Sequence, residues 1–493
     1  MAEVDVASSE KIPFIHWADA KRIIILAVPA MLALLTQTLV NTVDTYFFGK
    51  LPEPDHTDGQ AMLSVALPLL WGIGGFFAAI SVGTQSMVAR REGQGEPQAA
   101  GAVLMNAVVL AVGVSVVVAI IGYYSVGAIY RVYLNLSATM GSFSGGSAGS
   151  DVALNRMASD AHFNNVAIGY TQWRFVGVVP LVITAAYKAY FDGTGRTYVH
   201  FVAAVVMNVA NVILCWLLIF GNMGMPRMGV AGAGVAAAAS SWVGLFVVIL
   251  FSFGKKDRKD RSPYRANTIS RKTVWEIARI SIPSGFATTI VMLGVLLFRQ
   301  IIQALDSQLG PDSEAINGAA TTIIIQVLSM MFFACLALGV ATATLVSQEL
   351  GAGRPNAAER VAWTSVRLGA ILFTVLGALQ VMFPESLMLL FKASPGVMHV
   401  GVNALRLMGA CGPLIAFAMI FTQALFGAGN TRYVMWVELC LHFLWLVPGA
   451  FIFGVWFKGG LFGVWAVAAG YIALLAFFMW LEFRRGRWKT IKI

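Results

Sequence analysis

The sequence predicts an all-α integral membrane protein whose twelve transmembrane helices form two pseudo-symmetric six-helix bundles. Three observations predict this fold. First, the 493 residues are 58% hydrophobic and 12% charged, about half the charged fraction of a soluble domain. Second, twelve apolar segments are long enough to cross a bilayer, which takes about 20 residues. Third, two motifs from the first half of the chain recur in the second half.

The first repeated motif is a glycine-marked turn between two apolar segments. Residues 82–101 read VGTQSMVARREGQGEPQAAG, and residues 340–359 read VATATLVSQELGAGRPNAAE. At an offset of 258 positions, the GxG pair that begins at Gly93 recurs at Gly351. A chain built from two copies of one bundle has a natural cleft between the copies, which is an architecture of transporters.

The second repeated motif locates a difference between the halves. FDGTGRT at 191–197 recurs as LFGAGNT at 425–431, at an offset of 234 positions. Because this offset is smaller, the first half must hold roughly 24 additional residues between its two motifs. The stretch 134–160 is rich in Gly and Ser, and this composition predicts a flexible extracytoplasmic loop.

A basic connector divides the predicted spans into two sets of six. We expect an N-terminal segment (1–21), a first bundle (22–254) with an extracytoplasmic loop near 134–163, a basic linker (255–273), a second bundle (274–483) and a basic tail (484–493). The predicted spans lie near 22–49, 61–89, 99–125, 165–191, 197–220, 229–253, 275–304, 315–348, 357–383, 397–426, 431–454 and 459–483.

The net charge of +10 is concentrated beside the spans. Eight basic residues lie between Lys255 and Lys272, and five lie between Arg484 and Lys492. Basic clusters next to membrane spans are topology signals that stay in the cytoplasm, which explains them better than nucleic-acid binding does. We therefore expect a protein of the cell (inner) membrane with both termini in the cytoplasm and no nucleic-acid partner.

The first span carries a polar stripe. Gln37, Asn41 and Asp44 are spaced four and three apart, which places them on one helical face. An ionised carboxylate at membrane depth costs several kcal/mol, so it usually faces a cavity or a partner. The stripe predicts a wet interior surface; the alternative is that Asp44 meets water near the outer interface. Asn208 and Asn211 in span five would face Asp44 across the first bundle, or else serve as packing contacts.

The first span of each half also contains a proline. Pro29 and Pro283 are related by an offset of 254 positions, and each removes a backbone hydrogen bond and permits a bend. Pro29 lies before Asp44 in its helix, where it would act as a hinge or as a static kink.

Several segments resemble the multidrug and toxic compound extrusion (MATE) family of transporters. The opening helix VPAMLALLTQTLVNTVDTYFFGKL at 28–51 is similar to the family's first helix, with its early proline, polar face and late aspartate. WRFVGVVP (173–180), NVANVILCWLLIFG (208–221), GVAGAGVAAAASS (229–241) and LRLMGACGP (405–413) extend the resemblance. It implies two lobes of six helices, and efflux of organic, often cationic, compounds in exchange for protons or sodium ions. It also implies that helix one bends when its aspartate is protonated.

The chain departs from the family at three acidic positions. Cys215 stands where the family often has an acid, Thr288 and Thr289 lie near an expected glutamate in span seven, and span ten has no acid. A desolvated Na⁺ needs several oxygen ligands whereas a proton needs one carboxylate, so these departures favour proton coupling.

The second bundle has its own titratable pair. Glu438 and His442 in span eleven are four apart and share a helical face. Because histidine titrates near neutral pH, the pair would relay a proton or contact a cationic cargo, or else neutralise each other structurally. Arg299, late in span seven, would reach the outer interface with its long side chain, which we favour, or serve as a counter-charge to Asp44 or Glu438.

Sequence patterns of enzymes and ATP-driven pumps are missing. No His/Asp/Glu cluster has metal-ligand spacing, no Ser–His pattern of a hydrolase is recognisable, and no GxxxxGK[ST] loop occurs. The four cysteines lie inside apolar segments, where they serve as small packing residues. We expect no enzyme activity, no metal site and no cofactor beyond a coupling ion.

The prediction is therefore a secondary active transporter that exports organic, cationic or drug-like compounds in exchange for protons or Na⁺ by alternating access. Its partners would be a small-molecule cargo and the lipid bilayer, and it would work as a monomer. The alternative is a flippase or exporter of a lipid-linked or polar metabolite of the same superfamily. The predicted ion-coupling residues are Asp44, Asn41, Asn208 and Asn211; the predicted substrate or cavity residues are Gln37, Thr288, Thr289, Arg299, Glu438 and His442; the predicted hinge is Pro29.

Overall fold

The computed structural model of the chain describes residues 15–52, 59, 62, 66, 70, 72–144, 161–254, 257–264, 268–309 and 315–493. The side chains of residues 37–45, 133–144, 161–163 and 258 lie outside the described set. Within the described ranges the chain is almost entirely helical and contains no strand.

The first bundle consists of the helices that precede the basic linker. A helical segment at residues 72–78 leads into α3. The helices are α1 (Trp17–Phe48), α3 (Ile80–Gly93), α4 (Pro97–Ser144), α6 (Ala161–Gly193), α7 (Tyr198–Phe220) and α8 (Gly229–Ser252).

The second bundle follows the linker. Two π-helical segments, η4 (Leu441–Leu446) and η5 (Phe451–Trp456), interrupt its penultimate span on either side of α16 (Val447–Ala450). The other helices are α9 (Arg271–Ser307), α10 (Ile316–Gly351), α11 (Pro355–Met382), α12 (Pro384–Leu390), α13 (Pro395–Ala410), α14 (Gly412–Ala428), α15 (Thr431–Cys440) and α17 (Gly460–Arg485).

The helices account for the predicted spans. Ten segments of the described chain are long and apolar enough to cross a membrane, and α13 with α14 makes an eleventh span that bends by 54°. At this bend a Cβ on Gly412 would lie 2.6 Å from the carbonyl oxygen of Phe373 in α11, so only glycine permits the approach. α1 covers residues 22–48 of the predicted span at 22–49. The all-α membrane fold is confirmed, and the span count is consistent with twelve.

The predicted loop at 134–160 is shorter than its composition suggested. α4 continues as a helix through Ser144, and α6 begins at Ala161. Residues 134–144 carry Leu, Met and Ala beside the Gly and Ser residues, and these good helix formers extend α4 beyond the predicted span. Residues 145–160 lie outside the described residues.

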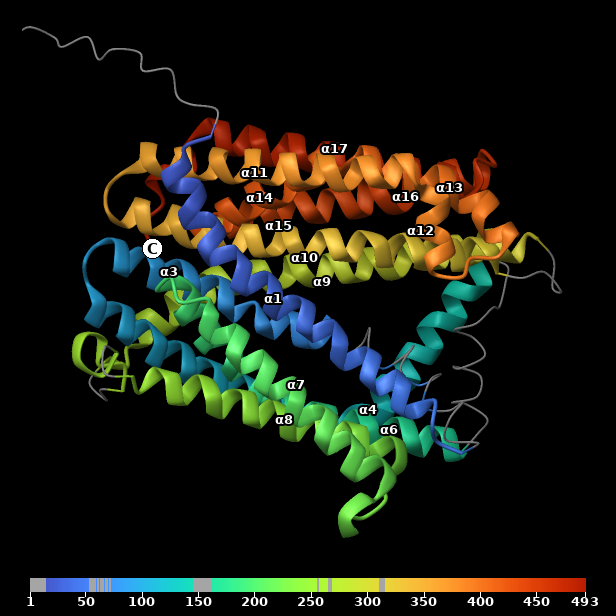
Figure 1. The fold of residues 1–493 in the computed structure, drawn as a ribbon, viewed down its shortest axis with the longest axis horizontal. Helices are drawn as coiled ribbons and strands as arrows, with labels where there is room; N and C mark the ends of the chain where they lie inside the picture. The colour runs from blue at the N-terminus through green and yellow to red at the C-terminus, as the bar shows by residue number, and fades with distance from the viewer. Residues whose placement is uncertain are drawn as a thin grey trace, which may run out of the picture.

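The two bundles meet at one end of the molecule and diverge toward the other (Figure 1). α1 begins and α17 ends where the bundles meet, and we call this end the closed end. The glycine-marked turns of both repeated motifs lie there, and the second glycine of each has a positive φ, from +70° to +87° at Gly95, Gly195, Gly353 and Gly429. Such left-handed positions favour glycine and end each helix.

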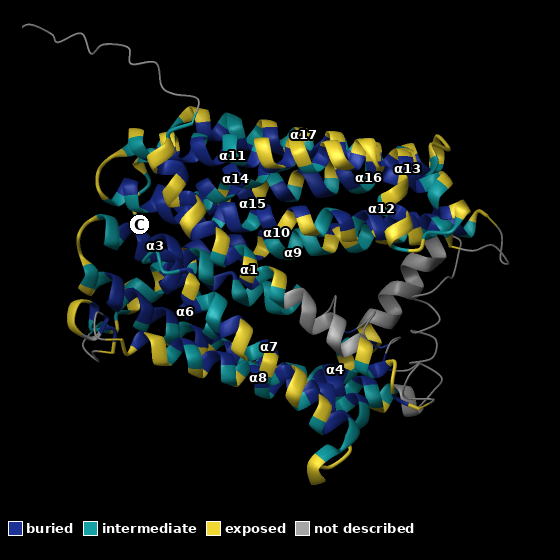
Figure 2. Cartoon of the chain, in the orientation of Figure 1, coloured by how far each residue is buried: buried dark blue, intermediate teal, exposed yellow. Residues whose placement is uncertain are grey.

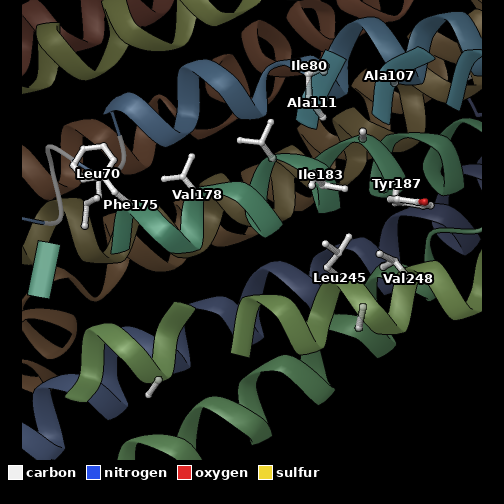
Figure 3. Close-up of a cluster of buried hydrophobic side chains, with 14 of the residues drawn as sticks. Leu70, Ile80, Ala107, Ala111, Phe175, Val178, Ile183, Tyr187, Leu245 and Val248 are labelled. Carbon is white, nitrogen blue, oxygen red and sulfur yellow. The ribbon is translucent and has the colours of Figure 1, made fainter. Parts of the chain in front are cut away.

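Each bundle has its own apolar core. In the first bundle, Ala107 and Ala111 of α4 pack with Phe175 and Val178 of α6 and Leu245 of α8 (Figure 3). The second bundle holds two clusters, one around Phe421 and Trp488 and the other around Met408 and Trp465.

Apolar side chains also cover the outer surface, where exposed residues line the outward sides of the helices (Figure 2). On α4, Val117, Ile120, Ile121 and Tyr124 are all exposed. A soluble monomer rarely exposes such a continuous apolar face, so this is the surface expected to contact lipid.

The first helix of each half begins against the other half. Ile23 and Leu26 of α1 pack into the core of the second bundle, whereas Ile277 and Ile280 of α9 pack into the core of the first. Pro29 and Pro283 follow these contacts within a turn or two. Each proline therefore lies where its helix passes from the neighbouring bundle toward its own.

The basic linker is fastened to the first bundle by a buried ion-pair network. Asp257 accepts hydrogen bonds from Arg196 at 2.5 and 2.7 Å and from Tyr190 at 2.6 Å, while Arg261 reaches Glu92 at 2.7 Å. Burial alone would lower the pKa of Arg196, but the hydrogen bonds and charge of Asp257 raise it above its ordinary value. The linker is thus bound to the first bundle by these ion pairs.

Candidate functional site

The closed end is built on close contacts between the repeated motifs. A Cβ on Gly93 would overlap the carbonyl oxygen of Gln348, and a Cβ on Gly351 would overlap that of Arg90. Gln348 and Arg90 occupy equivalent positions of the repeat, so the two contacts are related by the pseudo-symmetry. The first glycine of each GxG motif lets the two bundles touch backbone to backbone.

Hydrogen bonds between α3 and α10 complete this contact. Gln85 donates to the carbonyl oxygen of Val340 at 3.0 Å and to the hydroxyl of Thr344 at 2.8 Å. The hydroxyl of Ser347 donates to the carbonyl oxygen of Ser86 at 2.7 Å. A small pocket lies beside these bonds, lined by Val82, Gln85, Ser86, Ala343, Gln423, Phe426 and Gly427.

Ion pairs surround the contact. Arg22 of α1 lies 2.9 Å from the carboxylate of Glu349 in α10, and Arg360 of α11 lies 2.8 Å from that of Asp19 in α1. Both carboxylates are buried, whereas both arginines are exposed. Water screens exposed partners, so each pair contributes at most about 1 kcal/mol.

The C-terminal residues also bridge the bundles. Arg90 of α3 donates to the carbonyl oxygens of Ile491 at 3.3 Å and of Ala428 at 3.4 Å. The side chain of Ile491 packs on the core of the second bundle, and that of Ile493 packs on the core of the first. The predicted tail is therefore part of the closed end.

The polar stripe of α1 is only partly described. The helix runs through positions 37, 41 and 44, but the side chains of Gln37, Asn41 and Asp44 lie outside the described residues. Next to them, Asn208 of α7 donates to the carbonyl oxygen of Thr36 at 2.8 Å. The buried carboxamide oxygen of Asn208 has no hydrogen-bond partner in the described part of the chain.

Asn211 has different neighbours from Asn208. Its side chain lies 3.4 Å from the hydroxyl of Ser240 in α8 and 3.9 Å from the sulfur of Cys215, one turn later in α7. Asn208 therefore contacts α1, while Asn211 lies between α7 and α8 in a packing contact, which the sequence leaves as an alternative.

The predicted residues of span seven do not gather into one site. Thr288 and Thr289 donate to the carbonyl oxygens four residues earlier in α9, at 3.1 Å each. Thr288 also faces the first bundle, because a Cβ on Gly75 would lie 3.1 Å from its methyl group. Arg299, later in α9, is exposed.

Glu438 and His442 do form a cluster. The exposed fractions of the two residues are 7% and 2%, and His442 Nδ1 lies 3.3 Å from Glu438 Oε2. The hydroxyl of Tyr471 in α17 donates to the same Glu438 oxygen at 2.7 Å, and the rings of Tyr471 and His442 meet edge to face. Tyr471 could not be predicted from the sequence, because spacing along one helix carries no signal about the neighbouring helix.

Comparison with known proteins identifies the family. A family model described as MatE matches residues 29–141 and 287–452, together more than half of the chain. The probable multidrug resistance protein NorM of Thermotoga maritima is 26% identical over 486 residues, covering 97% of this chain and 94% of its own. The multidrug resistance protein MdtK of Pectobacterium atrosepticum is 23% identical, covering 89% and 88%.

Solved structures share the fold. An outward-facing structure of a multidrug resistance MATE family transporter superposes with a TM-score of 0.80 at 20% identity, covering 96% of this chain and 97% of that one. A MOP superfamily transporter from Pyrococcus furiosus superposes with a TM-score of 0.78, also at 20% identity and with the same coverage. The chain is a multi-pass membrane protein and a transporter rather than an enzyme, and it belongs to the MatE (MATE) family.

Proposed function

We propose that this protein is a secondary active exporter of organic, cationic or drug-like compounds, driven by entry of protons or Na⁺, with Asp44 as the ion-coupling carboxylate. The observation that carries the proposal is the path of α1. This helix packs against the second bundle before Pro29 and against α7 of the first bundle beyond it, where Asn208 bonds Thr36. A helix that contacts both bundles and carries an acid can link ion binding to the packing between bundles.

The closed end is proposed to face the cytoplasm. The turns there carry Arg196 and Arg354, and the basic linker and tail lie beside them. Basic residues that flank spans favour the cytoplasmic side. The helices diverge at the opposite end (Figure 1), so cargo would leave from there.

The proposed cycle uses differential affinity. With the closed end sealed, ionised Asp44 would bind a proton or Na⁺ from outside, and loss of its charge would release the cargo and let α1 bend at Pro29. The Gly93 and Gly351 contacts would then separate, and cargo binding from the cytoplasm would expel the ion. Ion and cargo must prefer opposite states of the protein for this exchange to run.

Transport into inverted membrane vesicles tests the role of Asp44. Vesicles that contain the wild-type protein should accumulate ethidium, a fluorescent organic cation, when the lumen is made acidic or loaded with Na⁺. Comparing the two gradients identifies the coupling ion. Asp44→Asn should abolish this gradient-driven uptake, and uptake at the wild-type rate would remove Asp44 from the mechanism.

The relatives that match over most of this chain are named multidrug resistance proteins, which supports a drug-like cargo over a lipid-linked one. A competition assay with structurally unrelated organic cations would extend the test to cargo range.

A further inference from the structure

The cluster of Glu438, His442 and Tyr471 lies inside the second bundle, away from α1. Its three side chains come from α15, η4 and α17. Glu438 and His442 are nearly inaccessible to solvent. Burying a carboxylate at membrane depth is costly unless it is paired or hydrogen-bonded, so such residues usually have a function.

The hydrogen bonds show where protons lie in the cluster. His442 Nδ1 lies 2.9 Å from the carbonyl oxygen of Glu438 and 3.3 Å from its carboxylate. A carbonyl oxygen only accepts, so Nδ1 must carry a hydrogen. Tyr471 donates its hydroxyl hydrogen to the carboxylate. With a neutral imidazole and an ionised carboxylate the cluster has a charge of −1, and in that form it can take up one further proton.

No other acid or base intervenes among the described residues 268–309 and 315–493. α14 has no charged residue, and α9 presents Gly294 to the histidine ring. Tyr433 bonds the carbonyl oxygen of Phe478, and Cys440 is exposed. The charged or titratable residues of the surrounding helices lie toward the helix ends or are exposed: Arg271, Lys272, Glu276, Arg279, Arg299 and Asp306 on α9, His399 and Arg406 on α13, Arg432 on α15, and Glu482, Arg484 and Arg485 on α17.

The histidine is in direct contact with α9. A Cβ on Gly294 would overlap His442 Cδ2 and would lie 3.1 Å from Nε2. α9 also contacts the first bundle, where a Cβ on Gly285 would lie 2.8 Å from the carbonyl oxygen of Phe76. A change of charge in the cluster therefore acts directly on α9, the helix that contacts both bundles.

The backbone around the histidine is adapted to this arrangement. The π-helical segment η4 begins at Leu441, and the His442 ring bonds the Glu438 carbonyl group at this junction. π-helical turns inside α-helices occur frequently at functional sites. The offset of 254 that relates Pro29 to Pro283 also relates Gly294 to position 40, between Gln37 and Asp44. The cluster thus lies at the depth of the polar stripe in the first bundle.

We propose that Glu438, His442 and Tyr471 form a second proton-binding site, which gives up one proton when an organic cation binds. The proton adds to the Glu438–His442 pair, which then carries no net charge, either as a carboxylic acid beside a neutral ring or as a carboxylate beside an imidazolium. Strongly interacting groups titrate as a unit, so the site is the pair rather than either residue. This proposal rests on the proposed ion-coupled export.

The test counts protons. Purified protein in detergent and weak buffer is titrated with ethidium over a series of pH values, and a pH-indicator dye reports the protons released per ethidium bound. Glu438→Gln keeps an oxygen that accepts from Tyr471, and it should lower the maximal count by about one proton. Glu482→Gln is the matched control: this buried carboxylate accepts a hydrogen bond from Asn430 and lies 3.7 Å from Arg485 at the closed end, and the count should not change.

A second variant keeps the carboxylate. Tyr471→Phe removes a hydrogen bond that stabilises the ionised form, so the count should persist while the pH of half-maximal release rises by about one unit. If this hydrogen bond had only a structural role, its loss would not change the pH of half-maximal release.

Three outcomes separate the possibilities. An unchanged proton count in Glu438→Gln, or an unmoved release curve in Tyr471→Phe, overturns the second site. Weaker ethidium binding in Glu438→Gln with an unchanged count also overturns it, and indicates a cargo contact instead. If Asp44→Asn leaves the count unchanged while Glu438→Gln lowers it, the assigned role of Asp44 fails and the second site stands.

Discussion

Gly351→Ala should loosen the closed end. The added methyl group would overlap the carbonyl oxygen of Arg90 in the other bundle, and backbone cannot rotate aside as a side chain does. α3 and α10 must therefore move apart. Gly93→Ala should act in the same way, because its methyl group would overlap the carbonyl oxygen of Gln348.

The magnitude follows from the cost of overpacking. An added methyl group in a well-packed contact typically costs about 1–3 kcal/mol. Because the methyl group lies between the bundles, this cost falls on the closed arrangement and not on either bundle alone. At about 1.4 kcal/mol per tenfold, the population with separated bundles should rise by about 5- to 150-fold.

Thiol labelling measures this population. Ser347 is fully buried, and its hydroxyl bonds Ser86 across the contact, so a cysteine in its place reacts with a maleimide only when the bundles separate. The background carries Cys440→Ala, because Cys440 is exposed whereas Cys215, Cys335 and Cys411 are buried. The labelling rate of Ser347→Cys should rise by the same factor as the open population.

A matched glycine provides the control. Gly113 of α4 has no atom within 4 Å of an added Cβ, so Gly113→Ala tests the intrinsic preference of alanine for helix without a steric clash. It should leave the labelling rate unchanged. A rate in Gly351→Ala equal to the wild-type rate, or lower, would refute the inference that this backbone contact holds the bundles together.

Three further predictions use the same protein. Arg22→Gln removes a screened ion pair to Glu349 and should raise the labelling rate of Ser347→Cys by no more than about fivefold. This increase should vanish in concentrated salt, and an increase that persists in salt would contradict its electrostatic origin. Asp257→Ala leaves Arg196 without its carboxylate, whereas Arg261 loses a longer contact and keeps Glu92. The substitution should lower stability by about 2–4 kcal/mol, measured by thermal unfolding in detergent. Because the pKa values of both arginines are raised, mildly alkaline pH should not weaken these pairs. Gly294→Ala displaces the His442 ring and should alter the pH dependence of ethidium-induced proton release. An unaltered pH dependence would contradict the inference that α9 responds to the charge of the cluster.

The spans and the repeats could be predicted from the sequence because both depend on local composition and order. The contacts that the repeats make could not. Nothing in VGTQSMVARREGQGE indicates that Gly93 touches Gln348, since that contact depends on how two bundles dock. The crossing of α1 and α9 into the opposite cores was missed for the same reason.

The candidate site was predictable where one helix supplies it. The spacing of four between Glu438 and His442 placed them on one face, and the structure has them 3.3 Å apart. Tyr471 comes from another helix, and the π-helical segment begins at Leu441, where the His442 ring bonds the Glu438 carbonyl oxygen. Neither has a signal in residue spacing. Asn211 lies beside Ser240 of α8, a neighbour that residue spacing along α7 does not reveal.

The central claim is that an ion gradient drives organic cations through this protein, and flux in liposomes under a reversible gradient tests it most directly. Purified protein is reconstituted with equal ethidium on both sides, and a proton or Na⁺ gradient is then imposed in one direction or the other. We predict a net movement of ethidium in the direction opposite to the flow of the ion. This movement should reverse when the gradient is reversed, and it should be absent in Asp44→Asn. Ethidium that stays evenly distributed under both gradients in the wild-type protein would contradict it.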